Sequence, residues 1–386
     1  METPNRHILH LDLDSFFVSV ACLLNPLLKG KPVAIGEESN RSVVSSCSYE
    51  ARRYGVRSAM PVYQAKRLCP QLIVVSHGRG QYGKYSGMVA QIIANEAPIF
   101  QQASIDEFYL DLTGLDRFFG CFQWASQLRQ RIIKETGLPI SFGLATNKMV
   151  AKVATGEAKP NGQLYVQPGT EKQFLAPLTI DKIPMAGDVT CRKLRSMGME
   201  TVKQLQNCPI EHLQRWLGKK HGELLWQRAQ GIDHSQVQPD EEDAKSVSKE
   251  HTFETDVQDN DLLRKTIVRM TEKLAYQLRR DKQLSACVTI KLRLPNFETC
   301  TRQTTIAATC FDKPLTQTAL QIFDQLRLTY PQPVRLIGVR LSNLTPTAAQ
   351  QLNLFEPAEK LTQLYTAIDW VKTKYGAGKL VKAQGF

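Results

Sequence analysis

The sequence predicts an α+β protein built from several domains. Its 386 residues exceed the usual size of one domain, and 42% hydrophobic with 22% charged residues is the balance of an ordinary folded protein. Strand-like and helix-like segments alternate over residues 104–158. The polar, acidic residues 238–244 then interrupt the pattern before a second run of strands and helices.

The first strand is predicted at residues 7–14, HILHLDLD. Its leucines alternate with His10, Asp12 and Asp14, so we expect a half-buried strand with one polar face. Short elements are predicted to follow: strands at residues 31–36 and 42–46, a helix at 48–56 and another opening at Met60 and Pro61.

A clearer run of elements begins at residue 104. Trp124, Leu128 and Ile132 recur at a spacing of four, as on one face of a helix. The run suggests a sheet covered by helices on one face. It comprises strands at residues 104–112 and 139–145 and helices around Trp124 and at 147–157.

Residues 168–231 form a short part that we expect to be helical. The segment IPMAGDVTCRKLRSMGMETVKQL predicts two helices around a tight turn. Beyond the acidic stretch a second α+β unit is expected. It comprises strands at residues 245–254, 285–296, 300–307 and 334–344 and helices at about 258–281 and 315–328.

The chain is basic, with 49 Lys and Arg against 37 Asp and Glu and a formal charge of +12. The excess suggests a polyanionic partner, since each phosphate neutralised by a cation releases counterions. Lys and Arg outnumber Asp and Glu within residues 245–345, where two cationic strands could line one face. A basic surface without function is the alternative.

Targeting and redox signals are few. No apolar run approaches the roughly 18 to 20 residues that cross a bilayer, and the start METPNRHILHLDLDSFF lacks the features of a secretion signal, so we expect a cytoplasmic protein. The nine cysteines are an odd number without a Cys-x-x-Cys pair. This argues against a disulfide framework or a zinc site and favours reduced core thiols.

Two neighbouring carboxylates stand at the start of the strand SIDEFYLDL. Because adjacent side chains on a regular strand face opposite ways, either Asp106 and Glu107 both reach solvent or a positive group neutralises them. If this strand neighbours the first one, Asp12 joins them. Three carboxylates suit two magnesium ions and phosphoryl transfer. Surface acids at strand ends are the alternative.

The surrounding motifs resolve this choice. LDLDSFFVSV, SYEARRYGVRSAMP, SIDEFYLDLTG and KPNG occur in the order and near the separations seen in the Y family of DNA polymerases, and the chain resembles its DNA polymerase IV type from about residue 7 to the tail. The resemblance implies a right-hand polymerase of α+β fold. Its parts would be a palm at residues 1–22 and 77–167, fingers at 23–76, a helical thumb with a helix-hairpin-helix at 168–232, a linker at 233–244, a little finger at 245–345 and a tail at 346–386.

The resemblance implies template-directed addition of deoxynucleotides to a primer, past damaged bases and without proofreading. Asp12, Asp106 and Glu107 would be catalytic and would hold two Mg²⁺ ions, helped by the backbone carbonyl of Leu13. Primer-template DNA and deoxynucleoside triphosphates would be the substrates. We expect the enzyme to be monomeric.

A metal site at the start of the strand SIDEFYLDL has a structural consequence. Both carboxylates must face the open side of the sheet, so we expect the strand to be irregular at residues 106–107. Phe108, Leu110 and Leu112 should then return to alternation and hold the site rigid from behind.

The resemblance also places a nucleotide pocket. Phe17 would be the steric gate that excludes a ribose 2′-hydroxyl, with core packing as its alternative role. Ser58, Ala59 and Met60 would lie over the templating pair. The remaining nucleotide-binding residues would be Phe16, Ser46, Tyr49, Arg52 and Lys159, of which Tyr49 and Arg52 share one helical face.

Two segments depart from the family pattern. The thumb reads IPMAG where the family commonly has IPGVG or IPGIG, so Met185 replaces a glycine that would let backbone amides approach a DNA phosphate, while Gly187 remains. TGEAKPNG replaces the more usual SDMAKPNG or SDMNKPNG, which keeps Lys159 and changes the helix before it.

The tail contains QLNLF at residues 351–355, which resembles the bacterial sliding-clamp motif. Gln351, Leu352, Leu354 and Phe355 would bind the clamp, unless they begin a packed helix. A helical stripe follows and should dock on the body or a partner. Its members are Leu361, Leu364, Tyr365, Ile368, Val371 and Tyr375.

Two alternatives of other classes stay open at this point. A non-catalytic scaffold that binds DNA and clamp would keep the fold, although the three carboxylates argue against it. A nucleotide cyclase would share a palm-like sheet and two-metal chemistry. The cyclase does not explain the basic second unit or QLNLF.

Overall fold

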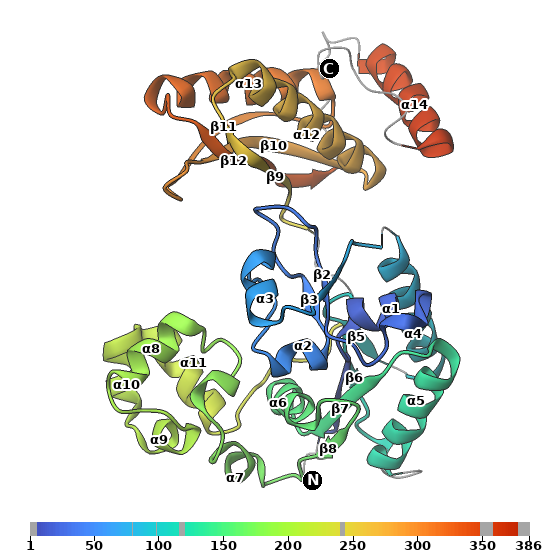
Figure 1. Ribbon diagram of the computed structural model, residues 1–386, viewed down its shortest axis with the longest axis vertical. Helices are drawn as coiled ribbons and strands as arrows, with labels where there is room; N and C mark the ends of the chain where they lie inside the picture. The colour runs from blue at the N-terminus through green and yellow to red at the C-terminus, as the bar shows by residue number, and fades with distance from the viewer. Residues whose placement is uncertain are drawn as a thin grey trace. The chain divides into compact units, whose positions relative to one another are not determined.

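The computed structural model describes residues 6–78, 80–97, 99–115, 120–239, 244–347 and 358–376. The chain forms two compact units, Met1–Glu241 and Glu242–Phe386. Figure 1 labels their helices and strands. Within the described ranges no helix is both long and apolar enough to cross a membrane. No disulfide joins the described cysteines, which are buried or partly buried thiols.

A five-stranded sheet forms the centre of the first unit, in the order β5-β6-β1-β7-β8. The central strand β1 runs antiparallel to both β6 and β7, and β8 runs parallel to β7. The strands are β1 (Ile8–Leu13), β5 (Phe100–Gln102), β6 (Glu107–Asp111), β7 (Ile140–Ala145) and β8 (Gln163–Tyr165).

Helices cover both faces of this sheet, which corrects the expectation of one covered face. The leucines of β1 pack with α1 (Phe16–Leu24), α4 (Gln81–Glu96) and α5 (Cys121–Thr136) in one core. On the other face lies α6 (Lys148–Ala158), to one side of the sheet in Figure 1 while α4 and α5 lie to the other. Gly143 makes this packing possible, because a Cβ there would stand 2.3 Å from the Ala151 carbonyl oxygen.

The first strand is therefore not half-buried as predicted. His10 and Asp14, expected on an open polar face, are 1% and 2% exposed. The His10 ring lies under α6, where its Nδ1 is 2.8 Å from Thr155 Oγ1. Alternation in the sequence separates two faces of a strand, but it does not say whether polar side chains on one face are solvated or hydrogen-bonded to a helix.

A small sheet, β3-β2-β4, forms a separate layer of the first unit. The α2 and α3 helices pack on it through a small core that includes Val44, Ala51 and Val62. The elements are 3₁₀ helix η1 (Pro26–Leu28), β2 (Val33–Ile35), β3 (Ser46–Cys47), α2 (Tyr49–Arg53), α3 (Val62–Leu68) and β4 (Ile73–Val75).

A helical part completes the first unit and contains the predicted pair as α8 and α9. These two helices join through a turn at Gly198, whose φ is 80°, and a capping box between Thr201 and Gln204 begins α9. The elements are α7 (Glu171–Leu175), η3 (Ile180–Lys182), α8 (Asp188–Arg195), α9 (Val202–Asn207), α10 (Ile210–Leu217) and α11 (Lys219–Ala229).

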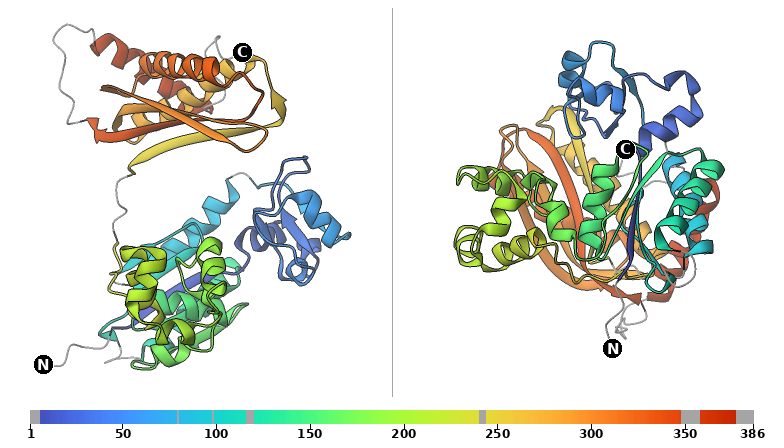
Figure 2. Two further views of the ribbon diagram at one scale, coloured as in Figure 1. Left: turned by 90° about the vertical axis from the view of Figure 1, so that its left-hand side faces the viewer. Right: turned by 90° about the horizontal axis from the view of Figure 1, so that it is seen from below.

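The second unit is an antiparallel sheet in the order β11-β10-β12-β9. Two helices, α12 and α13, cover one face, as the left view of Figure 2 shows. The elements are β9 (Ser246–Val257), α12 (Asn260–Arg280), β10 (Gln283–Arg293), β11 (Thr299–Thr309), α13 (Asp312–Thr329), β12 (Val334–Pro346) and α14 (Ala358–Tyr375).

The predicted stripe describes the docked face of α14 only in part. Tyr365 is 4% exposed and Lys372, which is not in the stripe, is 7% exposed. The docked face is therefore centred on Tyr365, Asp369 and Lys372. In the rest of the stripe Leu364 and Tyr375 are exposed, Ile368 and Val371 are half-buried, and the side chain of Leu361 lies outside the described residues.

Candidate active site

The pairing of β1 with β6 brings the predicted carboxylates to one end of the sheet. Asp12 lies directly opposite Glu107 in the antiparallel register. Asp106 immediately precedes β6, and its carbonyl oxygen accepts the N–H of Leu13 at 3.0 Å. Three acids that are far apart in the sequence thus occupy adjacent positions on two neighbouring strands.

The backbone at Asp106 is irregular, as predicted. β6 begins only at Glu107, and residues 104–106 form a bend. Ser104 Oγ accepts the N–H groups of Asp106 and Glu107 at 3.3 and 3.1 Å and donates to Asp106 Oδ1 at 2.7 Å. The bend frees the two adjacent carboxylates from the alternation that would send one of them into the core.

A rigid apolar wall backs the site. Phe108, Leu110 and Leu112 are fully buried in the same core as the leucines of β1. The expectation that these three side chains hold the strand from behind is confirmed.

Lysines neutralise two of the three carboxylates. Lys159 forms an ion pair with Asp12, and Lys152 Nζ lies 2.7 and 2.8 Å from the two oxygens of Glu107. Both lysines come from α6 or its end. Of the two possibilities for the adjacent acids, solvent exposure or a neutralising positive group, the second applies to Glu107, because Lys152 lies beside it.

The protonation of Asp12 reflects its surroundings. Burial raises the pKa of Asp12 from 3.8 to about 6; Lys159 opposes the shift, and the charges of Glu107 and Asp106 add to it. The carboxylate is therefore poorly satisfied by a single lysine. A stronger positive charge would stabilise its ionised form.

The donor set fits magnesium in kind. Carboxylate oxygens at a strand end are the hard ligands that Mg²⁺ takes together with phosphate oxygens and water. No group of three His, Cys, Asp or Glu in the described parts of the chain is already arranged around a metal position. Lys159, Lys152 and Ser104 each hold one of the acids instead.

Sequence reasoning missed the part that Asp14 plays. Its carboxylate accepts Ser141 Oγ at 2.9 Å and the N–H of Asn161 at 2.7 Å, and the Tyr49 hydroxyl donates to it at 3.2 Å. Asp14 thus ties the end of β1 to β7, to the KPNG turn and to α2. The alternation of His10, Asp12 and Asp14 was a signal, but the partners lie 35 to 147 residues away in sequence.

His10 is a second residue that the sequence left without a role. Its ring is buried beneath the site, with Nε2 3.9 Å from Glu107 Oε1. Burial, and then the charges of Lys152, Lys159 and Lys148, lower the pKa of His10 well below its ordinary 6.5. A neutral ring at this place adds no charge beside Glu107, and its buried Nε2 has no hydrogen-bond partner among the described residues.

The KPNG turn presents Lys159 to the site. Asn161 has a φ of 53°, a left-handed conformation that Asn tolerates. A Cβ at Gly162 would lie 2.0 Å from the Ala158 carbonyl oxygen, so only glycine fits there. Arg129 donates to the Asn161 carbonyl and side chain, which fixes the turn beside β7.

The predicted phosphate-binding residues cluster at α2. The Arg52 guanidinium stacks 4.6 Å above the Tyr49 ring. Ser48 begins the helix by accepting the N–H of Ala51, and Ser46 lies on β3 opposite Ile35. Because Tyr49 also reaches Asp14, this cluster adjoins the end of β1.

The two phenylalanines differ in exposure. Phe16 is 2% exposed and packs in the core, so its side chain is not available to a nucleotide and only its backbone is. Phe17 is partly exposed and stacks on Tyr82 with ring centroids 4.2 Å apart. The ring of Phe17 is therefore held in one orientation by its neighbour.

Met185, the departure in the helical part, stands in a strained conformation. Its φ is 72°, where glycine would be unstrained, and its side chain is 65% exposed. Near the other predicted contacts, Ala59 has a φ of 66° and is exposed, as is Ser58, while Met60 packs on a small core. The predicted clamp residues 351–355 lie outside the described residues.

Comparisons with known proteins agree with this architecture. The impB/mucB/samB family matches residues 11–156, its C-terminal domain matches residues 244–354, and the thumb domain of DNA polymerase iota matches residues 181–233. Together these three matches cover most of the chain.

Full-length relatives are similar throughout. A DNA polymerase IV of Dehalococcoides mccartyi strain 195 is 38% identical, over 97% of this chain and 96% of that protein. The DNA polymerase IV of Desulfatibacillum aliphaticivorans is 35% identical over 97% and 96%. A solved chimeric Y-family DNA polymerase is 26% identical with a TM-score of 0.77, covering 88% of this chain and 99% of its own. The chain therefore belongs to the Y family of DNA polymerases, the impB/mucB/samB family, and resembles its DNA polymerase IV members along nearly its whole length.

Proposed function

We propose that this polymerase adds deoxynucleotides to a primer 3′ end by two-metal phosphoryl transfer and copies damaged templates. The observation that carries the proposal is the meeting of Asp12, Asp106 and Glu107 at one strand end, beside cationic and phenolic groups suited to a triphosphate. Two magnesium ions held there would activate the attacking oxygen and stabilise the leaving group.

Within this proposal the acids hold the metals and the palm fixes the acids. Asp12 and Glu107 face each other across the β1–β6 pair, and the Ser104 hydroxyl orients Asp106. The backbone carbonyl of Leu13 completes the set. Because the strands behind them are fully buried, the acids keep their spacing while the substrate changes.

The triphosphate would lie between α2 and the KPNG turn. Arg52 offers a fork to phosphate oxygens, and Tyr49 stays protonated because burial and Asp14 raise its pKa. Lys159 would exchange Asp12 for a phosphate once a metal neutralises that acid. The first turn of α1 begins at Phe16 without a side-chain cap, so its backbone N–H groups are further donors for an anion.

The sugar gate is proposed for Phe17. Its stack on Tyr82 gives the ring a fixed edge against which a 2′-hydroxyl would collide. Phe17→Ala should raise incorporation of ribonucleotides relative to deoxynucleotides. An unchanged ratio would show that Phe17 does not exclude the 2′-hydroxyl.

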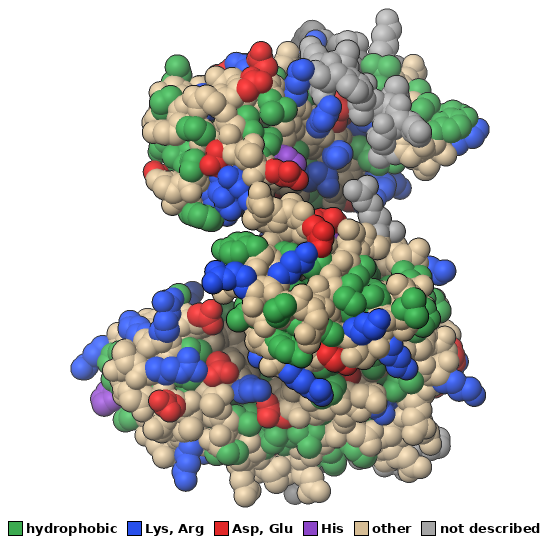
Figure 3. Space-filling model, viewed as in Figure 1, with side chains coloured by type: hydrophobic (Ala, Val, Ile, Leu, Met, Phe, Trp, Pro, Cys, Tyr) green, Lys and Arg blue, Asp and Glu red, His purple; other side chains and the backbone are tan. Residues whose placement is uncertain are grey.

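DNA would run along basic surfaces of both units. Lys and Arg side chains are spread over each unit on the face shown in Figure 3. On the sheet face of the second unit that α12 and α13 leave uncovered, Lys291 and Arg293 stand in register with Thr301 and Thr299, and Arg340 with Thr289. Arg and Thr side chains in such rows suit phosphate oxygens, whereas Lys291 is paired with Glu250 at 2.7 Å, so a phosphate would have to compete with that acid.

Recruitment by a sliding clamp is proposed for residues 351–355. QLNLF carries a Gln and apolar anchors of the kind that fill a groove on a partner. The polymerase is further proposed to act as a monomer in the cytoplasm.

Primer extension tests the catalytic proposal. Wild type should extend a primer on undamaged and lesion-bearing templates with Mg²⁺ and stop with a chelator. Asp106→Ala should slow extension at least about 10³-fold, the scale of losing a group aimed at developing charge, while DNA binding persists. Asp111→Ala, at the far end of the same strand, is the matched control and should extend normally. Undiminished extension by Asp106→Ala would refute the assignment.

A further inference from the structure

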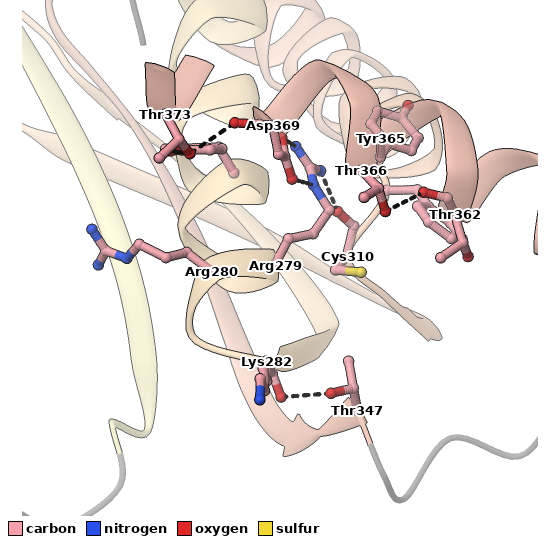
Figure 4. Close-up of a pocket in the computed structure, with 12 residues that line it drawn as sticks. Arg279, Arg280, Lys282, Cys310, Thr347, Thr362, Tyr365, Thr366, Asp369 and Thr373 are labelled. Atoms are coloured by element: carbon pink, nitrogen blue, oxygen red, sulfur yellow. Dashed lines mark hydrogen bonds and ion pairs between the residues drawn. The ribbon is translucent and has the colours of Figure 1, made fainter. Parts of the chain in front are cut away.

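The C-terminal helix α14 is held on the second unit by a buried charge. The Arg279 side chain of α12 is 9% exposed. Its Nε and Nη2 donate to both carboxylate oxygens of Asp369 on α14, at 2.6 and 2.9 Å. Figure 4 shows this fork, with Asp369 pointing at Arg279 from the helix.

Arg279 is also held from the other side. Its Nη1 donates to Asp312 Oδ1 at 2.7 Å and to the Cys310 carbonyl oxygen at 2.8 Å. Burial disfavours the charged guanidinium, but the hydrogen bonds to Asp369 and Asp312 outweigh it and raise the pKa of Arg279. The guanidinium is thus fixed by the body of the domain and presents its remaining edge to α14.

Aromatic packing surrounds the ion pair. Tyr365, one turn before Asp369, is 4% exposed and stacks on Phe311 with ring centroids 5.3 Å apart and an interplanar angle of 17°. Arg279 lies 4.6 Å above the same Tyr365 ring. One turn further, the hydroxyls of Thr373 and Tyr276 are 3.0 Å apart. The contact is therefore built along one face of α14.

The chain before α14 is fastened close by. Thr347 donates its N–H and its hydroxyl to the Lys282 carbonyl oxygen, each at 2.9 Å. Lys282 lies just beyond the end of α12, three residues after Arg279. Thr347 before residues 348–357 and the α14 helix after them are therefore both held on this unit, at Lys282 and, through Asp369, at Arg279.

We propose that Tyr276, Arg279, Phe311 and Asp312 form a docking site for a helix that carries an aromatic and an acidic residue one turn apart. In this chain the occupant is its own α14, through Tyr365 and Asp369. Docking holds the described residues on both sides of the segment that contains QLNLF, Thr347 before it and α14 after it, which would shorten the span that the motif can explore when it meets the clamp. This last consequence rests on the proposed clamp function, whereas the docking does not.

Physical chemistry favours docking over an independent helix. In proteins a helix gains most of its stability from packing one face against its surroundings rather than from its own propensity, and this applies to the 18-residue α14. The Arg279–Asp369 fork supplies charge-assisted hydrogen bonds in a water-poor site, where they are strong. Fixing both ends of a binding segment lowers the ordering cost when it binds.

Hydrogen exchange in the full-length protein tests the docking. Amides of α14 should be protected in wild type, and Asp369→Asn should raise their exchange about 10- to 100-fold because a charge-assisted pair is lost. Tyr365→Ala should do the same by removing the aromatic packing. The matched control is Asp324→Asn, which breaks the exposed Arg264–Asp324 pair between α12 and α13 and should leave α14 unchanged.

Exchange in Asp369→Asn equal to wild type would overturn the docking proposal. So would wild-type α14 amides that exchange as fast as those of a free peptide of residues 358–376. Both outcomes are independent of any clamp.

Binding to a bacterial sliding clamp separates the two proposals. Deleting residues 351–355 should abolish binding, and Asp369→Asn should weaken it about 3- to 10-fold by the lost preorganisation. Unchanged binding by the deletion would refute the clamp function and leave the docking result standing. Loss in the deletion with wild-type affinity in Asp369→Asn would refute the role of docking in recruitment.

Discussion

Partly or fully buried charges are paired in two ways in this protein. In the palm, Asp12 and Glu107 are neutralised by single ammonium groups, and the lysine side chains keep 22% and 40% of their surface exposed. In the little finger, Arg279 is 9% exposed and shares its donors between two aspartates. In the first arrangement each acid has one lysine partner, whereas in the second one arginine is shared by two acids.

The difference follows from the chemistry of the two cations. A lysine is a compact charge on a flexible stem, so it can leave a carboxylate when a metal or phosphate offers a better partner. An arginine fork is planar and bidentate, and removing it strands a buried acid. Under the proposed function the palm pairs belong to a site that exchanges its partners, whereas the little-finger pairs belong to a contact that persists.

Among variants of the cations in the two kinds of pair, Lys159→Met should have the largest effect. Lys159→Met should lower kcat/KM for nucleotide addition about 10- to 100-fold, since a charge-assisted phosphate contact is lost. Lys159→Arg should also be impaired, because a fork would hold Asp12 more firmly. Single-turnover incorporation over a range of nucleotide concentrations gives both values. Full activity of Lys159→Arg would show that the palm does not need an exchangeable partner.

Removing the charge of Asp12 should stabilise the metal-free protein. The folded pKa of about 6 lies above the ordinary 3.8, so Asp12 contributes stability at low pH that is lost as the pH rises from about 4 through 6. Asp12→Asn does not titrate, and Lys159 can turn to solvent. The variant should therefore have a free energy of unfolding about 1–3 kcal/mol higher at pH 7.5, with the gain vanishing near pH 4.

Urea unfolding of the metal-free proteins across pH measures this gain. A lower free energy of unfolding for Asp12→Asn at pH 7.5 would mean that Lys159 fully satisfies Asp12. The palm acid would then be as well paired as the acids of the little finger, contrary to the proposed difference between the two domains.

Shortening the little-finger fork should cost somewhat less. Arg279→Lys keeps the charge but cannot hold Asp312 and Asp369 together, so the free energy of unfolding of the second unit should fall by about 1–2 kcal/mol. Arg264→Lys, at the exposed pair with Asp324, should change it by less than about 0.5 kcal/mol. Fluorescence of Trp370, the only tryptophan after residue 241, follows the transition. Equal stability of wild type and Arg279→Lys would contradict the claim that Asp312 and Asp369 need an arginine fork between them.

Much of the palm site was readable in the sequence because its signals are local. The adjacent acids of SIDEFYLDL predicted an irregular strand start, and the apolar residues after them predicted the wall behind. What sequence could not supply were the partners. Lys152 lies 45 residues from Glu107, and no periodicity links Asp14 to Asn161.

Elements with weak sequence patterns were also hard to predict. The α4 helix carries Gly83 and Gly87, which lower helix propensity, and no strong apolar stripe announces it. Its place is fixed by the packing of Val89 and Ile93 in the palm core. Likewise the stripe predicted for α14 followed apolar residues, whereas its docked face is selected by Asp369 and its arginine partner.

Counting bound ions tests the central claim most directly, because the claim is that the palm acids exchange lysines for metals. Electron paramagnetic resonance can count Mn²⁺, a stand-in for Mg²⁺, on the enzyme with primer-template DNA and a non-hydrolysable nucleotide. Wild type should hold two ions, Asp106→Ala fewer, and Asp111→Ala two. Equal ion counts in wild type and Asp106→Ala would contradict the assignment of this strand end as the metal site.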